Sequence, residues 1–126
     1  MSASDGSGAS RQGELELFVC ILNRAELLDD VLAGMLEAGA AGATVYEGRG
    51  MWQILASEVP LFTGLRSIFP VAPGPNHTII SVIPRDKIES VIAVIQDIAG
   101  DIGTPGAGII FTLPVSRVAG LARQTP

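Results

Sequence analysis

Apolar residues recur along the chain with two periods that alternate. From Glu14 they first fall at every second position, which is typical of a β-strand, and the positions between them are apolar too. After Asn23 they recur three and four apart, which predicts an amphipathic helix with the stripe Leu27, Leu28, Val31, Leu32, Met35 and Leu36. Asn23 and Glu26 predict a capping box, and Gly39 and Gly42 predict the stop. A strand over residues 43–47 completes a strand–helix–strand unit.

The second half of the chain repeats this unit. Residues 77–83 are rich in β-branched side chains and predict a third strand. A second helix follows, with the stripe Ile88, Val91, Ile92, Ile95 and Ile98, and Gly100 ends it. A glycine loop over residues 101–108 then leads to a last strand over residues 109–115. We expect one further turn of helix within residues 116–123.

Two segments stand apart from the repeat. Residues 1–13 are rich in Ser, Gly and Ala and predict a disordered tail. Residues 51–76 form an insertion, predicted as one short helix through Trp52 that ends at Pro60 and a second helix carrying Leu61 and Phe69. Because its apolar side chains would cost roughly 25 cal/mol per Å² in water, we expect them to pack as a lid or a subunit contact.

The order of elements predicts an α+β fold over residues 14–123. The economical arrangement is a ferredoxin-like βαββαβ sandwich, an antiparallel sheet with both helices on one face and a helical insertion between its second and third strands. The other face should be polar, but the first and last strands are apolar on both sides. An apolar face without helices to cover it predicts a closed homo-oligomer.

Composition supports self-association. The 126 residues are 48% hydrophobic and 17% charged, yet the sequence has no apolar run of the roughly 20 residues that span a bilayer. We therefore expect no membrane insertion. The net charge of −5 argues against a general affinity for nucleic acid. A single cysteine, Cys20, forms no internal disulfide and is expected to be a buried thiol, and without a secretory signal the expected location is the cytoplasm.

Two stretches carry a family pattern. Residues 28–50 follow L-x-D-D-V-x-x-x-L-x-x-x-G-x-x-G-x-T-V-x-E-x-x-G, and residues 106–115 read GAGIIFTLPV. Together they resemble the nitrogen-regulatory PII signalling proteins. The resemblance implies a homotrimer with nucleotide clefts between subunits and a long loop that docks on a partner protein.

The site residues transfer only in part. Gly106 and Gly108 match the family's phosphate-loop glycines, but the family's lysine falls at Ile109 and its two arginines fall at Gly120 and Ala122. Losing charge-assisted bonds worth roughly 1.5–3 kcal/mol each predicts weak or absent ATP binding. The loop tyrosine is also missing, since the only tyrosine, Tyr46, lies in a predicted strand. The candidate ligand residues are Thr44, Arg49, Gly50, Gly106, Gly108 and Arg117.

Two functional interpretations remain open. The first is a non-catalytic trimeric sensor that binds a small metabolite between subunits, an adenine nucleotide being one candidate, and regulates a partner protein. The alternative is a structural or assembly trimer that has lost ligand binding. We do not expect an enzyme or a metal site, because the sequence shows no nucleophile–base pair and no Cys/His cluster around its only histidine, His77.

Overall fold

Four antiparallel strands form a single sheet. The computed structural model describes residues 14–58, 61, 74–102 and 106–121. The strands are β2 (Leu15–Leu22), β3 (Thr44–Gly48), β4 (Asn76–Pro84) and β5 (Gly108–Val115), in the spatial order β3-β4-β2-β5. Every neighbouring pair is antiparallel. The first and third strands in the chain are therefore central, and β3 and β5 are the edges.

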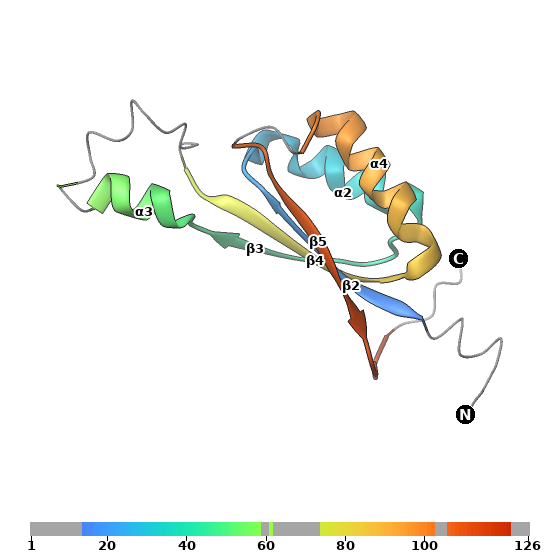
Figure 1. Ribbon diagram of the computed structural model, residues 1–126. Helices are drawn as coiled ribbons and strands as arrows, with labels where there is room; N and C mark the ends of the chain where they lie inside the picture. The colour runs from blue at the N-terminus through green and yellow to red at the C-terminus, as the bar shows by residue number, and fades with distance from the viewer. Residues whose placement is uncertain (1–13, 59–60, 62–73, 103–105, 122–126) are drawn as a thin grey trace.

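Two helices cover one face of this sheet (Figure 1). They are α2 (Leu28–Ala38) and α4 (Ile88–Ala99), each entered through a short 3-10 turn, Ala25–Leu27 and Arg85–Lys87. The helices approach closely at Gly34, where an added Cβ would lie 3.0 Å from Ile98 Cδ1. This arrangement confirms the predicted α+β sandwich with an antiparallel sheet, and it is consistent with the ferredoxin-like fold.

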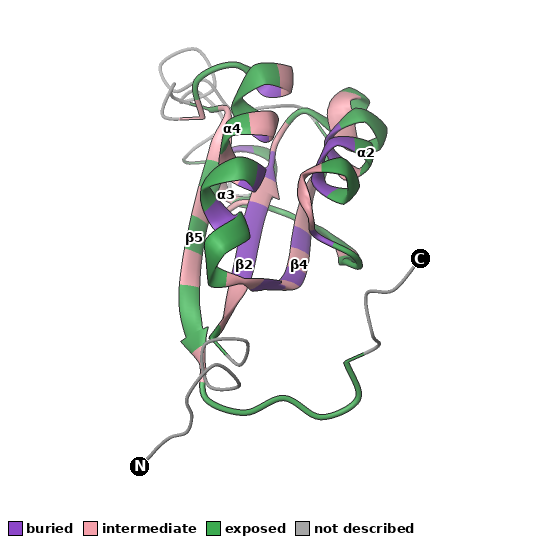
Figure 2. Ribbon diagram, turned by 90° about the vertical axis from the view of Figure 1, so that its right-hand side faces the viewer, coloured by how far each residue is buried: buried purple, intermediate pink, exposed green. Residues whose placement is uncertain are grey.

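The core lies between the helices and the sheet (Figure 2). Phe18 pairs across the ladder with Ser81, Cys20 with Ile79, and all four are buried. The helices contribute the other buried side chains, chiefly Val31, Met35, Ile88, Val91 and Ile95. The predicted stripes therefore lie on the core side of both helices except at Leu36, which is 63% exposed.

The opposite face of the sheet is apolar and open. Along the β2–β5 ladder, Ile21 pairs with Ile109, Val19 with Phe111 and Leu17 with Leu113. The three β5 side chains are 42–51% exposed. The predicted second apolar face is therefore confirmed, and in the described part of the chain its β5 row remains half-exposed.

Two local predictions are wrong. The capping box does not form: the Asn23 amide donates to the carbonyl of Gly106 at 3.0 Å, while Glu26 pairs with Arg24 at 3.1 Å. Asn23 ties the β2 end to the glycine loop, so α2 begins only after the 3-10 turn. Nor is there a helix in residues 116–121, the described part of the predicted turn, where Gly120 has φ +89°.

The insertion begins with α3 (Met51–Glu58), which confirms its first predicted helix. The second predicted helix lies outside the described residues apart from Leu61. In α3 only Ala56 is buried, and Trp52 remains 43% exposed. The expected packing of this apolar surface is therefore not found within the described part of the chain, where α3 projects from the end of the β3–β4 pair (Figure 1).

Burial of Cys20 predicts a pH dependence of stability. Desolvation raises the pKa of its thiol from 9.0 to about 11. The folded state thus keeps a proton that the unfolded chain releases above pH 9, so stability is retained below pH 9 and falls as the pH rises towards 11. We expect the difference in unfolding free energy between the wild type and Cys20→Ala to shrink over this range in urea titrations. A constant difference would contradict the buried, protonated thiol.

Candidate functional site

A pocket of about 300 Å³ lies where β3 separates from β4. The ladder between the two strands runs only from the Gly48–Asn76 pair to the Thr44–Ile80 pair. Beyond this pair, residues 41–43 no longer pair with β4, and the pocket lies between them and the continuing strand. Its lining is Ala41, Gly42, Ala43, Thr44, Ile80, Ser81, Val82 and Leu121. We call it the edge pocket.

The edge pocket is apolar with a few neutral polar groups. None of its lining residues is ionisable, and its polar side-chain groups are the hydroxyl of Thr44 and that of Ser81, which donates to the carbonyl of Gly42. β4 continues to Pro84 beyond its last pair with β3, so its main chain there has no strand on that side. These features favour an uncharged group of a ligand, held by apolar walls and neutral hydrogen bonds.

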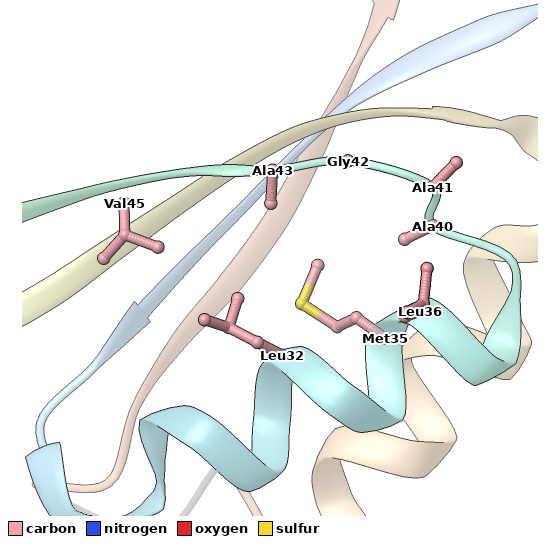
Figure 3. Close-up of a pocket in the computed structure, with 8 residues that line it drawn as sticks. All are labelled: Leu32, Met35, Leu36, Ala40, Ala41, Gly42, Ala43 and Val45. Atoms are coloured by element: carbon pink, nitrogen blue, oxygen red, sulfur yellow. The ribbon is translucent and has the colours of Figure 1, made fainter. Parts of the chain in front are cut away.

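Residues Ala41–Ala43, here called the ledge, separate the edge pocket from a second one. The second pocket, of about 230 Å³, lies between α2 and the ledge (Figure 3). Leu32, Met35 and Leu36 rise from α2 towards Ala40, Ala43 and Val45. The ledge is therefore a thin wall with a cavity on each side.

The sequence-predicted site residues lie at opposite edges of the sheet. Thr44 begins β3 and lines the edge pocket, and Arg49 and Gly50 follow the end of β3. Gly106 and Gly108 lie at the start of β5, on the far edge. Gly108 pairs with Leu22, Leu22 with His77, and His77 with Glu47, so three strand spacings, roughly 14 Å, separate the two edges. One copy of the chain does not bring the predicted shell together.

Comparison with known proteins identifies the family. The model of the nitrogen regulatory protein P-II family matches residues 17–124. The chain belongs to this family.

A solved structure supports the assignment. PII of Arabidopsis thaliana, in a crystal structure bound to citrate, is 25% identical over 81% of this chain and 75% of its own, with a TM-score of 0.54. No curated protein sequence matches the chain. The resemblance seen in residues 28–50 and 106–115 is thus confirmed at the level of family and fold.

Arg49 already has a partner in this P-II chain. Its Nη2 atom lies 2.6 Å from Glu58 Oε2 and 3.4 Å from Ser57 Oγ, both in the last turn of α3. The guanidinium therefore holds the insertion helix rather than facing the edge pocket. Arg117 follows β5 and is exposed. An anion that uses Arg49 must compete with Glu58.

The backbone structure itself explains why glycine stands at both positions of the predicted phosphate loop. Gly108 adopts φ +147°, and an added Cβ would lie 2.2 Å from the carbonyl oxygen of Ile21. Gly106 has φ +83°, and its carbonyl accepts the hydrogen bond from Asn23. Glycine is explained at position 108 by the close approach of β5 to β2 and at position 106 by the left-handed backbone, whether or not an anion binds there.

Sequence reasoning missed most of the edge pocket. Ile80, Ser81, Val82 and Leu121 come from a strand and a tail that gave no sign of a ligand site. The available signal was Ser81, a small polar residue at a position that alternation assigns to the core. Among the described residues no cluster of three or more His, Cys, Asp or Glu could hold a metal ion. No helix in that part of the chain is long and apolar enough to cross a membrane.

Gly108→Ala tests the steric requirement. Because a Cβ must displace the backbone of β2, we expect the substitution to lower the unfolding free energy by more than about 2 kcal/mol. Gly120→Ala is the matched control: Gly120 also has a positive φ, but nothing lies within 4 Å of its added Cβ, so we expect a loss of about 1 kcal/mol. Urea denaturation measures both values. Equal losses would show that the contact with Ile21 is unimportant.

Proposed function

We propose that this P-II chain is a homotrimeric regulatory protein that binds a small metabolite at the boundary between copies and regulates a partner protein. The observation that carries the proposal is the division of the candidate shell between two sheet edges. A pocket for an uncharged group lies at the β3 edge, and a glycine loop lies at the β5 edge. Two neighbouring copies bring such edges together.

The open face of the sheet supports the assembly. Ile109, Phe111 and Leu113 form a continuous row of half-exposed side chains beside β2. Exposed apolar surface costs about 25 cal/mol per Å², so covering this row with other copies is favourable. In a closed ring of three copies, neighbouring copies cover one another's open faces, so that no such face stays exposed. The trimer is therefore the assembly that we propose for this family member.

The chemistry of the two edges suggests the class of ligand. Its uncharged part occupies the edge pocket beside Thr44, and its anionic part approaches the glycine loop at Gly106 and Gly108 of a neighbouring copy. An adenine nucleotide has this division between base and phosphates, but Ile109 supplies no charge, which supports weak phosphate binding. Citrate, bound in the Arabidopsis PII structure, extends the test set to carboxylate anions.

A specific observation favours the alternative, an assembly trimer without ligand binding. Arg49, the cation nearest to the β3 edge in the candidate shell, is held by Glu58, and α3 presents Met51, Trp52 and Ile54 as exposed apolar side chains. Such a surface can form a permanent contact with another protein as readily as a contact that a ligand controls. The two functions differ in whether any small molecule binds.

Light scattering on a sizing column tests the assembly. We expect the wild type at three times the 13.1 kDa chain mass. Phe111→Glu places a charge in the middle of the open face and should yield monomers, because burying an unpaired carboxylate costs several kcal/mol. Leu36→Glu is the control, since Leu36 is exposed on α2, away from this face, and should leave the trimer intact. A monomeric wild type would overturn the proposal.

A melting-temperature screen tests ligand binding. The compounds are ATP, ADP, 2-oxoglutarate, citrate and bicarbonate, each with and without Mg²⁺. A compound at about 100 times its dissociation constant adds roughly 2.7 kcal/mol to stability, which is a shift of several degrees. Thr44→Val should reduce that shift, whereas Thr78→Val, on the same face but outside the edge pocket, should not. If the trimer forms and no compound shifts its melting, the assembly function is supported instead.

A further inference from the structure

Ser81 is the exception in the core of this protein. It is 3% exposed and is the only buried polar side chain among the described residues. The ladder places it opposite Phe18, on the helix-covered face of β4. A buried hydroxyl without a partner destabilises a fold by about 1–3 kcal/mol, so its hydrogen bond is an important feature of the site.

The partner of Ser81 lies in the ledge. Its hydroxyl donates to the carbonyl of Gly42, a residue 39 positions earlier in the chain. Outside the strand ladders, this is the only hydrogen bond to a ledge residue in the described part of the chain. The neighbouring amide of Ala40 is tied back to Met35 of α2, and Thr44 belongs to the ladder with β4. Ser81 therefore bridges the one stretch between α2 and β3 that has no backbone support.

Side-chain packing does little to fix the ledge. Its residues are Ala, Gly and Ala, and an added Cβ at Gly42 would meet nothing within 4 Å. The second pocket lies between it and α2 (Figure 3), and the edge pocket lies between it and β4. With a pocket open to solvent on each side and little side chain of its own, the ledge is held chiefly by the hydrogen bond from β4.

We propose that Ser81 is the positioning residue of the edge pocket: its hydrogen bond to Gly42 holds the ledge at the separation from β4 that keeps this pocket open for an uncharged ligand group. The inference rests on the proposed ligand site, but the restraint itself exists without a ligand. Loss of the hydroxyl releases the ledge, and the wall of the pocket becomes mobile while the core packing of β4 is retained.

Hydrogen exchange on the ligand-free protein tests the restraint. We expect Ser81→Ala to speed exchange of the ladder amides at the start of β3, at Thr44 and Val45, at least tenfold, with little change in α4, because the ledge leads directly into this end of the ladder. Ser81→Thr keeps the hydroxyl and should restore slow exchange. Ile83→Val, a core truncation two residues along the same strand, serves as the control for general destabilisation and should leave the ledge unchanged. Unchanged exchange in Ser81→Ala, or equal acceleration in Ile83→Val, would overturn the proposal.

Titration with ATP separates this inference from the proposed function. If ATP binds the wild type, we expect Ser81→Ala to weaken binding five- to tenfold and Ser81→Thr to restore it, and equal affinity in all three proteins would refute the positioning role. If ATP does not bind the wild type, the nucleotide form of the proposed function fails, and the exchange measurement alone decides the role of Ser81.

Discussion

The structure depends on a central strand that is apolar on both faces. Phe18, Cys20 and Leu22 point into the core beneath α2 and α4, while Leu17, Val19 and Ile21 alternate with them on the other side. A chain with two long helices covers only one face of a four-stranded sheet. The second face has no helix over it, and the described part of the chain leaves its β5 row half-exposed. The same apolar strand thus builds the core on one face and supports the proposed assembly on the other.

The candidate site follows from how the sheet ends at its β3 edge. β3 is four residues shorter than β4, and its pairing stops at Thr44. The remaining length of β4 is met by a loosely held loop instead of a strand, which leaves a pocket with apolar walls and free main-chain groups. At the other edge, β5 approaches β2 so closely that only glycine fits at position 108. One edge thus offers space and the other offers exposed backbone, which are complementary requirements for a ligand with a neutral and an anionic part.

The sequence predicted most of the fold because periodicity alone determines which side of each element is apolar. The stripes at Val31 and Met35 and at Val91 and Ile95 lie in the core as expected. The predicted capping box does not form because the Asn23 side chain bonds to Gly106, 83 residues away. The local sequence gives no sign of this competing hydrogen bond. The edge pocket was missed for the same reason: it arises where a ladder stops pairing, and pairing length is a property of two strands. The family pattern identified Thr44, whereas the only sign of Ser81 in the sequence was a polar residue at a core position of an apolar strand.

The two contacts that hold the movable parts of this chain are both side-chain contacts with little packing behind them. Ser81 holds the ledge from within the core, where low polarity makes a hydrogen bond strong. Arg49 holds α3 through Glu58 at the surface, where an ion pair is worth about 0–1 kcal/mol and is screened by salt. A small molecule with a favourable contact of that size can displace the second and not the first. In the proposed function, the edge pocket is therefore the fixed part of the protein and α3 is the part that responds to a ligand, as a sensor requires.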